Sequence, residues 1–525
     1  MIASRTWIWL LMGLLAAGFA AWWIRVPGYM DADYYYANAR QIVEGEGLQE
    51  PFLWNYLDDP QGLPHPSFTY WMPLASLVAS VSMMIAGEGF RAAQAPFILI
   101  TACLPVLTAH LAGRLTTDGK TIWQAAVLAM LPGFFFPFFV TTDTFALFAL
   151  VGGGAMAAMA SAAERGRPLR WLVVGLLTGL AHLARADGVL LLAPGLLAAV
   201  FWSKERRTSS AFLILAGYLA VMTPWWARGA LAGDNPLPLG LSRTLWLLRY
   251  DDLFSYPASI LTPERWWAAG LTAIGRDRLL ALLTNLQSLI AVNGLIVLGP
   301  FMIVAAIEKR HEPIVRLSGV YLALLIGVMS FVFPYAGSRG GFFHSSSALM
   351  PVLWALAPLG LLRTVRWAAE LRGWVVERAQ TLYGWTAPAL AGALTFGLLW
   401  SRVIGGTPSE PAWSGSAVAY ADVAAQLDSL DPSRPAVAVN NPPGFFLASQ
   451  SPSVMIPNGP PEVLRAATAR FNIVWVVLDA NRPEGLAGLY ETPSSVAWLQ
   501  LASRVQEPRG EDILLLWVLP EGVGP

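Results

Sequence analysis

The chain has 525 residues, of which 55% are hydrophobic and only 13% are charged, and its mean hydropathy is +0.52. Soluble domains carry about 25% charged residues, so this composition excludes a wholly soluble protein and predicts a polytopic membrane protein. The 34 basic residues balance the 34 acidic ones, which argues against a nucleic-acid partner. The single cysteine, Cys103, excludes an intramolecular disulfide and a cysteine-rich zinc site.

Eleven stretches are apolar enough to cross a bilayer as helices, which takes about 20 residues each. The first ends at Trp22 and Trp23, an aromatic anchor in place of a small-residue cleavage site, so we expect this helix to be retained. The predicted spans are 6–26, 95–113, 122–140, 144–162, 169–185, 187–203, 210–229, 287–307, 315–334, 346–363 and 383–401.

A twelfth apolar segment, residues 69–87, is ambiguous. Connections rich in Lys and Arg mark the cytoplasmic side, and they alternate correctly here only if 69–87 does not cross the membrane. We therefore predict a cytoplasmic N-terminus and an interfacial helix at 69–87. The basic residues that define the alternation are Arg5, Arg114, Lys120, Arg165, Arg167, Arg170, Lys204, Arg206, Arg207, Lys309, Arg310, Arg316, Arg363, Arg366, Arg372 and Arg378.

This topology places the long loops on the outer face, together with everything that follows the last span. The outer segments are the first loop 27–94, the turn 141–143, the turn 185–187, and the loops 230–286 and 335–345. Because only short basic connectors lie inside, we expect any chemistry on the outer face.

Residues 403–525 have the composition of a soluble domain and predict a small α/β fold. Apolar segments predict strands at 436–440, 454–457, 472–479 and 512–520, with a helix at 460–471 between two of them. Residues 403–525 contain no glycine-rich phosphate loop, so we interpret this domain as a lid or as a platform for a partner protein. The fold class predicted for the whole chain is an all-α polytopic membrane protein of about 11 transmembrane helices with a C-terminal soluble α/β domain.

Three carboxylates of the outer loops are candidate catalytic residues. Asp31 and Asp33 follow the first span, and Asp143 lies in a tight turn between two spans. A carboxylate at the membrane surface suits a general base that deprotonates a hydroxyl, or a ligand of a hard divalent cation. The alternative is that Asp31 and Asp143 cap the helices that follow them.

Five further residues form a predicted phosphate-binding or lipid-binding set on the same face. Arginine binds phosphate through two parallel hydrogen bonds and stays charged, and a histidine contributes charge only at lower pH. The set is His65, Arg243, Arg249, Arg339 and His344. Arg185 and Asp187 form an Arg-x-Asp turn that we interpret as structural, holding two helix ends together.

Three motifs resemble the GT-C glycosyltransferases, and within them the branch of dolichyl-phosphate-mannose protein mannosyltransferases and aminoarabinose transferases. The motifs are MDADYYYANARQIVEGEGL (30–48), LPHPSFTYWMPLAS (63–76) and TTDTFALF (141–148). The resemblance covers about residues 1–365, and it is strongest over 1–200. It identifies 1–402 as the glycosyltransferase domain, with loop 27–94 as the catalytic loop, and 403–525 as an outer domain.

The resemblance implies a sugar donor on a polyprenyl phosphate, transfer with inversion, and a lipid, glycan or protein acceptor. It implies Asp31 as the catalytic carboxylate, with Asp33 as the alternative, and Asp143 as a metal ligand or an acceptor contact. A divalent cation, Mg²⁺ or Mn²⁺, would be held by Asp31 and Asp143, or the enzyme would be metal-independent. The Lys that often precedes Pro-Pro in these transferases is replaced here by His65-Pro66-Ser67.

The sequence thus predicts an integral membrane glycosyltransferase. Few Lys and many Arg, Ala and Leu residues favour a bacterial inner membrane with an outward active site. One rival interpretation is a lipid or sugar transporter or flippase, whose sites usually lie near the bilayer midplane, where these spans carry few charges. Another is a non-catalytic scaffold of an envelope-assembly complex, which would have no need of the acidic residues.

Overall fold

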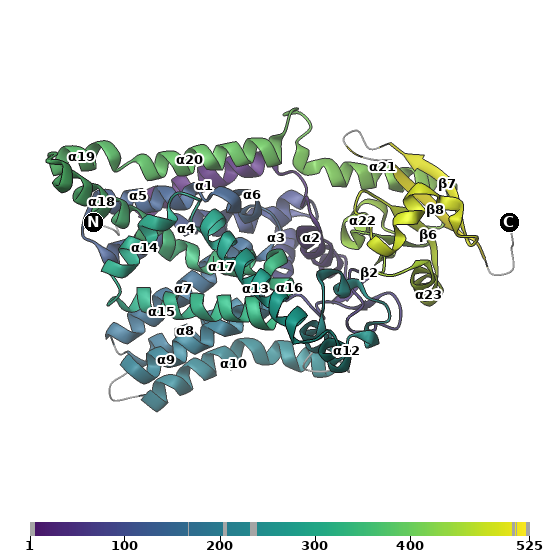
Figure 1. Ribbon diagram of the computed structural model, residues 1–525, viewed down its shortest axis with the longest axis horizontal. Coiled ribbons are helices and arrows are strands. Elements are labelled where there is room, and N and C mark those ends of the chain that lie inside the picture. Colours follow the sequence, from purple (N-terminus) through teal and green to yellow (C-terminus); the bar gives the residue numbers. More distant parts are fainter. Residues whose placement is uncertain are drawn as a thin grey trace.

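The protein is described by a computed structural model that covers residues 6–165, 167–202, 207–231, 239–506, 510 and 512–520. Figure 1 shows a long bundle of roughly parallel helices with a sheet-containing C-terminal part at one end. The basic residues Arg5, Lys204 and Arg206, which entered the topology prediction, lie outside the described residues.

Among the described residues, seven helical segments are long and apolar enough to cross a membrane. A bent pair, α5 (Gly119–Met130) followed by Gly133–Phe139, makes an eighth if it counts as one span, with a 45° bend at the break. The seven segments contain α1 (Thr6–Trp23), α4 (Phe90–Leu115), α7 (Thr144–Arg165), α10 (Arg207–Leu231), α15 (Pro313–Gly327), α18 (Met350–Arg372) and α20 (Thr386–Leu398).

The other predicted spans coincide with shorter apolar helices. α8 (Pro168–Ala184) and the segment Ala186–Trp202, which ends in α9 (Leu192–Trp202), occupy the predicted spans 169–185 and 187–203. The predicted continuous span 287–307 is wrong in its boundaries. There, α13 (Leu271–Ser288) ends, a π-helical turn follows, and α14 (Gly299–Glu308) begins after a break. The segment predicted as a loop at 230–286 therefore contains most of helix α13.

The segment predicted to lie along the membrane forms α3 (Leu74–Ala86), a helix of 13 residues. At a rise of 1.5 Å per residue this helix is about 20 Å long, shorter than the hydrocarbon core of about 30 Å. Its length agrees with a helix that does not cross the bilayer.

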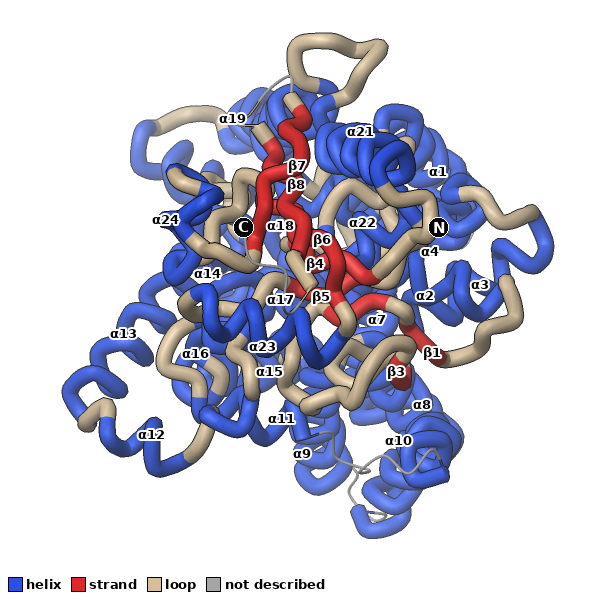
Figure 2. The backbone as a smooth tube through the Cα atoms, turned by 90° about the vertical axis from the view of Figure 1, so that its right-hand side faces the viewer, coloured by secondary structure: helices blue, strands red, loops and turns tan. Residues whose placement is uncertain are grey.

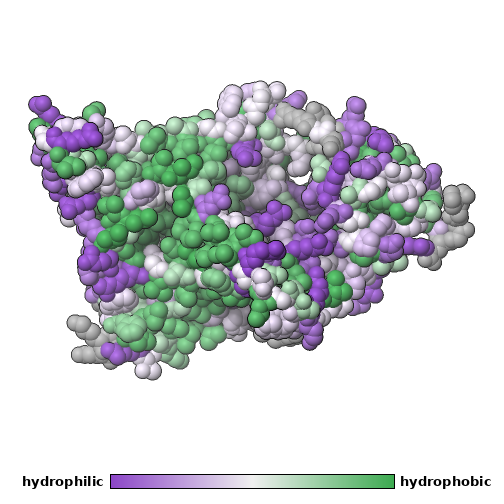
Figure 3. Space-filling model, in the orientation of Figure 1, coloured by the Kyte–Doolittle hydropathy of each residue, from purple (hydrophilic) through white to green (hydrophobic). Residues whose placement is uncertain are grey.

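The surface of the bundle has the polarity of a membrane protein. Large apolar side chains point outward on its helices, among them Trp7, Leu15 and Trp22 on α1. Figure 3 shows hydrophobic surface over the helices and hydrophilic surface at both ends of the bundle. The bundle thus exposes to lipid the kind of surface that soluble proteins bury.

The C-terminal part contains a six-stranded mixed sheet with the order β2-β5-β4-β6-β8-β7. The first four of these strands are parallel, β8 is antiparallel to β6, and β7 is antiparallel to β8. Figure 2 shows the strands crossing the end of the bundle. The predicted α/β domain is confirmed, while β7 was missed in the sequence. The bounds are β4 (Ala436–Val439), β5 (Ser453–Met455), β6 (Ile473–Leu478), β7 (Leu499–Val505), β8 (Ile513–Val518), α21 (Gly415–Leu430), α22 (Pro442–Ser449), α23 (Pro461–Phe471) and α24 (Ala487–Glu491).

The edge strand of this sheet comes from the first outer loop. Strand β2 (Phe52–Leu53) pairs in parallel with β5, and the Ser453 amide donates a hydrogen bond of 3.1 Å to the Pro51 carbonyl. The Tyr56 hydroxyl donates to the Met455 carbonyl. Both residues of β2 are buried in a core shared with the C-terminal strands. The catalytic loop predicted from the sequence is therefore folded onto the C-terminal domain.

Candidate active site

Helix α2 (Met30–Val43) begins directly after the first span and carries the DAD motif in its first turn. Its N-cap residue is Tyr29, which makes no capping hydrogen bond with its side chain, so the alternative that Asp31 caps this helix is wrong. Gly28 precedes the helix with φ +95°, and a Cβ there would lie 2.1 Å from Nε1 of Trp413. Only glycine allows this close approach to the C-terminal segment.

The turn that precedes α7 is hydrogen-bonded to the start of α2. The Thr141 hydroxyl donates to the Pro27 carbonyl at 3.1 Å, and the Thr142 hydroxyl donates to the Ala32 carbonyl at 2.9 Å. Asp143 is fully buried and accepts hydrogen bonds from the Tyr29 hydroxyl and from the Thr144 amide. Two segments more than 100 residues apart are thereby fixed side by side, as their common assignment to the outer face requires.

His344, on α17 (Phe342–Ser346), completes a cluster with Asp31 and Asp143. Its Nε2 lies 3.7 Å from Oδ2 of Asp31 and 3.9 Å from Oδ2 of Asp143. One ligand atom from each of the three residues lies within 4.8 Å of the other two. The sequence predicts His344 as a phosphate contact, whereas the structure places its Nε2 near two carboxylates.

Arg185 lies directly behind this cluster. Its Nη1 donates to Nδ1 of His344 at 2.9 Å, and its Nε donates to Asp187 at 3.1 Å and to the Ser345 hydroxyl at 3.2 Å. Asp187 in turn accepts from the Ser345 hydroxyl. The turn that we interpreted as structural is thus also a neighbour of the candidate site. Tyr29, Thr141 and Thr142 were missed altogether, although each lies next to or near a motif carboxylate.

The two carboxylates of the cluster hold protons more tightly than isolated carboxyls. Burial raises the pKa of Asp31, the charge of Asp143 raises it further, and the charge of Arg185 opposes the rise. Burial also raises the pKa of Asp143, against the hydrogen bond from Tyr29. Because the two groups interact, they titrate as a pair. Asp31 is the accessible member, with 27% of its side chain exposed against 0% for Asp143.

The donors of the cluster fit a divalent cation only in part. Carboxylate oxygens are the ligands that Mg²⁺ and Mn²⁺ prefer, so Asp31 and Asp143 fit. A histidine ligand needs a free lone pair on the coordinating nitrogen. Nδ1 of His344 is already in contact with Arg185, and its other ring nitrogen, Nε2, faces the carboxylates.

Asp33 is not brought into the cluster. It is buried, and its Oδ2 accepts a hydrogen bond of 2.9 Å from Nδ2 of Asn441, the N-cap residue of α22. Burial raises the pKa of Asp33 to about 7, and the Asn441 hydrogen bond opposes this rise. The predicted alternative catalytic residue therefore connects α2 to the C-terminal domain.

Exchanging the partners of this contact tests its role. We expect Asp33→Ala to lower whatever activity the enzyme has by about 10-fold, because a buried hydrogen bond to a charged group contributes about 1.5–3 kcal/mol. The double variant Asp33→Asn with Asn441→Asp restores a donor and an acceptor and should recover most of the loss. A double variant no better than Asp33→Ala would contradict a docking role and favour direct chemistry by Asp33.

His65 is buried in the first outer loop and has its own partners. Its Nε2 lies 3.1 Å from the Phe52 carbonyl oxygen and 3.1 Å from Oε1 of Glu50. Burial lowers the pKa of His65 to about 4, so the ring is neutral near pH 7. A neutral, enclosed ring does not support the predicted phosphate contact. The side chain instead joins β1 (Gln49–Glu50) to β3 (His65–Pro66).

Glu50 gives the first outer loop a pH-dependent stability. Burial raises its pKa to about 8 from an ordinary value of 4.5, against a hydrogen bond from Asn38. Between these pH values the folded state keeps a proton that the unfolded state releases, so stability falls as pH rises from about 4.5 to 8. We expect Glu50→Gln to be more stable than wild type at pH 9 by up to about 5 kcal/mol and to show little gain at pH 4.

Thermal unfolding in detergent across this pH range measures the effect. Glu44→Gln is the matched control, because Glu44 is an accessible carboxylate that pairs with Arg40 on the same helix end. A gain for Glu50→Gln that did not change with pH would contradict a protonated Glu50 in the folded protein.

The three predicted phosphate-binding arginines differ in their surroundings. Arg243 lies 2.7 Å from Asp59 and donates to the Leu57 carbonyl. Arg249 is exposed and lies 3.3 Å from Glu484 of the C-terminal domain.

Arg339 is also exposed and has no ion pair among the described residues. Its guanidinium carbon lies 4.7 Å from the ring centroid of Tyr250. Burial raises the pKa of Tyr250 to about 12, and the charge of Asp31 adds to this rise. The charges of Asp31 and Arg339 therefore both act on Tyr250, and Arg339 is the predicted arginine without an ion pair among the described residues.

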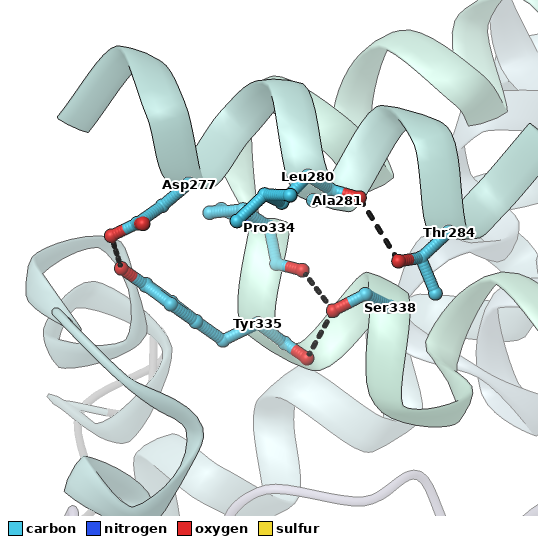
Figure 4. Close-up of a pocket in the computed structure, with 7 residues that line it drawn as sticks. All are labelled: Asp277, Leu280, Ala281, Thr284, Pro334, Tyr335 and Ser338. Carbon is cyan, nitrogen blue, oxygen red and sulfur yellow. Dashed lines mark hydrogen bonds between the residues drawn. The ribbon is translucent and has the colours of Figure 1, made fainter. Parts of the chain in front are cut away.

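A cavity of about 140 Å³ lies elsewhere, between α13 and α16 (Pro334–Ala336). Figure 4 shows that its polar side chains bond to their own surroundings. The Tyr335 hydroxyl donates to Asp277 at 2.8 Å, Ser338 to the Pro334 carbonyl at 2.8 Å and Thr284 to the Leu280 carbonyl at 2.9 Å. This cavity offers no cluster of unsatisfied catalytic groups, so we assign the candidate site to the Asp31 cluster.

Comparisons with known proteins agree with the resemblance given by the motifs. Residues 64–227 match the family model of the dolichyl-phosphate-mannose-protein mannosyltransferases. No curated protein sequence matches the chain. The structure is similar to ArnT from Cupriavidus metallidurans bound to undecaprenyl phosphate, with TM-score 0.55, 14% identity and 99% of each chain covered.

The fold is also similar to the oligosaccharyltransferase of Archaeoglobus fulgidus. The apo form gives TM-score 0.53 and 13% identity, covering 93% of this chain and 70% of that chain. The complex of that enzyme, AglB, with an inhibitory peptide and a dolichol-phosphate gives TM-score 0.51 and 14% identity, covering 90% and 69%. The chain therefore has the membrane fold of the GT-C glycosyltransferases, as its acidic first-loop motif and outer-turn Asp143 predict.

Proposed function

We propose that this protein is an integral membrane glycosyltransferase that moves a sugar from a polyprenyl-phosphate donor to a hydroxyl acceptor on the outer face of the membrane. The observation that carries the proposal is the convergence of Asp31, Asp143 and His344 in a GT-C fold. Helix α2, which carries Asp31, is hydrogen-bonded to the C-terminal domain through Asp33 and Asn441. The structural neighbours support the donor class, since ArnT was solved with undecaprenyl phosphate and AglB with a dolichol-phosphate.

Asp31 is the catalytic base in this mechanism. It is the accessible carboxylate of the pair, so it takes the proton from the acceptor hydroxyl as the oxygen attacks the anomeric carbon. The new carbon–oxygen bond forms opposite the bond to phosphate, which breaks, so the configuration inverts. Asp143 is buried and hydrogen-bonded, and it holds the start of α2 in place and orients the acceptor.

The polyprenyl phosphate leaves with the electron pair of the broken bond. Arg339 binds the phosphate oxygens and stabilises the negative charge that develops on them. This arginine is exposed and has no carboxylate partner among the described side chains. A Mg²⁺ or Mn²⁺ ion held by the oxygens of Asp31 and Asp143 would supply further positive charge beside the phosphate.

The proposal includes a topology. The N-terminus lies in the cytoplasm, and the active site and C-terminal domain lie outside the inner membrane of a bacterium. The alternation of basic connectors supports this orientation. The transporter interpretation gains no support, because the matching family model is one of mannosyltransferases and a structural neighbour is an oligosaccharyltransferase.

A cell-free transfer assay tests the function. Purified protein is mixed with a panel of radiolabelled polyprenyl-phosphate sugars and with lipid, glycan and protein acceptors from a membrane extract, with and without EDTA. We expect label to move from one donor to an acceptor in wild type. Labelled donors that all stay intact with every acceptor class would contradict the proposal.

A further inference from the structure

We propose that Arg185 is a positioning residue that fixes His344 in the tautomer with its proton on Nε2, so that His344 acts as a hydrogen-bond donor in the active site and not as a metal ligand. The inference rests on the proposed function. It assigns to His344 the task of binding the oxygen of the acceptor hydroxyl next to Asp31.

The tautomer follows from the contact between the two side chains. A guanidinium has five N–H donors, no acceptor, and keeps its charge at any working pH. Its Nη1 lies 2.9 Å from Nδ1 of His344, so Nδ1 must accept and cannot carry a proton. The proton of the ring is then on Nε2. The same contact excludes the doubly protonated ring, which has no acceptor.

The orientation of the ring is fixed by packing as well. The ring centroid of His344 lies 3.8 Å from that of Phe145, which is buried at the start of α7. Arg185 is held in turn by Asp187 and by the Ser345 hydroxyl. A ring that is fixed on two sides cannot turn over to offer the other nitrogen without breaking these contacts.

The Nε2–H group therefore points toward the two carboxylates. The distances of 3.7 and 3.9 Å to Asp31 and Asp143 are too long for direct hydrogen bonds. A hydroxyl group between them both donates and accepts, so it can donate to Asp31 while it accepts from Nε2–H. A cation cannot accept a hydrogen bond, so a cation in this place would be bound by the carboxylates without the histidine.

Two substitutions of His344 separate a donor from a ligand. Glutamine offers an N–H donor near the position of Nε2 but is a poor ligand, and glutamate offers a ligand oxygen but no donor at neutral pH. We expect His344→Gln to lower transfer by about 10-fold and His344→Glu by about 10³-fold, since the third carboxylate also repels Asp31 and Asp143. The reverse order would overturn the proposal.

Substitution of Arg185 gives a matched test. Arg185→Lys keeps a charged donor on this side of the ring, and Arg185→Met removes it. We expect the lysine variant to retain at least 10-fold more transfer than the methionine variant, through kcat and with little change in KM. Equal loss in both variants, with His344→Glu as active as His344→Gln, would show that Arg185 supports the fold only.

Nitrogen NMR of the wild-type protein labelled with ¹⁵N-histidine measures the tautomer independently of activity. The expected spectrum has His344 protonated on Nε2 and bare on Nδ1, and the proton stays on Nε2 when Mg²⁺ is added. The signal is assigned by its loss in His344→Gln or, if that variant does not fold, by single substitution of the other four histidines. A proton on Nδ1, or loss of the Nε2 proton on addition of Mg²⁺, would overturn the proposal.

The two proposals fail in different ways. A wild-type protein that transfers no sugar but shows the Nε2–H tautomer would contradict the proposed function and leave the Arg185 contact intact. An active protein with the Nδ1–H tautomer would contradict only the further inference.

Discussion

Replacing Asp31 by asparagine should lower sugar transfer by about 10³-fold, because general-base catalysis by a positioned carboxylate contributes about 10²–10⁴-fold. The side chain keeps its size, and 27% of it is exposed, so the change removes the base without opening a cavity. It also removes one of two neighbouring carboxylates that repel each other. We therefore expect the variant to unfold at the same temperature as wild type or higher.

Transfer rate and thermal stability, measured on the same preparation, check this prediction together. Asp428→Asn is the matched control, since Asp428 is a partly exposed carboxylate of α21 that pairs with Arg434 at 3.7 Å. We expect this control to remain within 2-fold of wild type. An Asp31→Asn enzyme that transfers sugar at the wild-type rate would rule out Asp31 as the base.

Replacing Arg339 by methionine should lower transfer by about 10²-fold, by removing the cation that stabilises the leaving phosphate. Methionine keeps the length of the apolar part of the side chain, so contact with the Tyr250 ring can persist while the charge is lost. We expect kcat/KM for a phosphate-linked donor to fall. The unfolding temperature should change little, because the substituted side chain is exposed.

Arg249→Met is the matched control for this second prediction. Both arginines are exposed on the same outer face, and both belong to the phosphate set predicted from the sequence. Arg249, however, is paired with Glu484 on the C-terminal domain. We expect Arg249→Met to lower transfer by less than 3-fold. Equal losses for Arg249→Met and Arg339→Met would contradict the assignment of the phosphate to Arg339.

The sequence was sufficient to predict that Asp31 and Asp143 lie on the same side of the membrane domain. The alternation of basic connectors assigns Asp31 and Asp143 to one side, and the structure places them side by side. The sequence could not show that Asp33, only two residues from Asp31, points away from the cluster and accepts a hydrogen bond from Asn441. On a helix, residues two apart do not share a face, but which of the two faces the site depends on tertiary packing.

The side chains that contact His344 and His65 could likewise be identified only from the structure. Each histidine was predicted to contact phosphate because it lies in an outer loop. Their neighbours are set by long-range contacts, with Arg185 far from His344 in sequence and Glu50 paired to His65 across two short strands. The broken helix at 289–298 was missed for a related reason. Its residues are apolar except for Asn293 and Gly294, so average hydropathy gives one continuous span where the backbone makes a π-helical turn. The Asn-Gly pair is a turn signal that the prediction overlooked.

Strand β2 is the clearest case of a feature that sequence patterns do not indicate. Two residues of the first outer loop form the edge of a sheet whose other strands begin almost 400 residues later. A two-residue strand has no periodicity to detect. Its position nonetheless explains why the loop predicted to be catalytic is well packed, because Phe52 and Leu53 share a core with the C-terminal domain.

The most direct test of the central claim is to reconstitute the purified protein in liposomes that contain one polyprenyl-phosphate sugar and an acceptor. The measurement is the ratio of free polyprenyl phosphate released to sugar transferred. The account predicts equal amounts of both products in wild type and almost none with Asp31→Asn. Movement of the intact donor across the bilayer, with its sugar–phosphate bond unbroken, would contradict a transferase and identify a transporter.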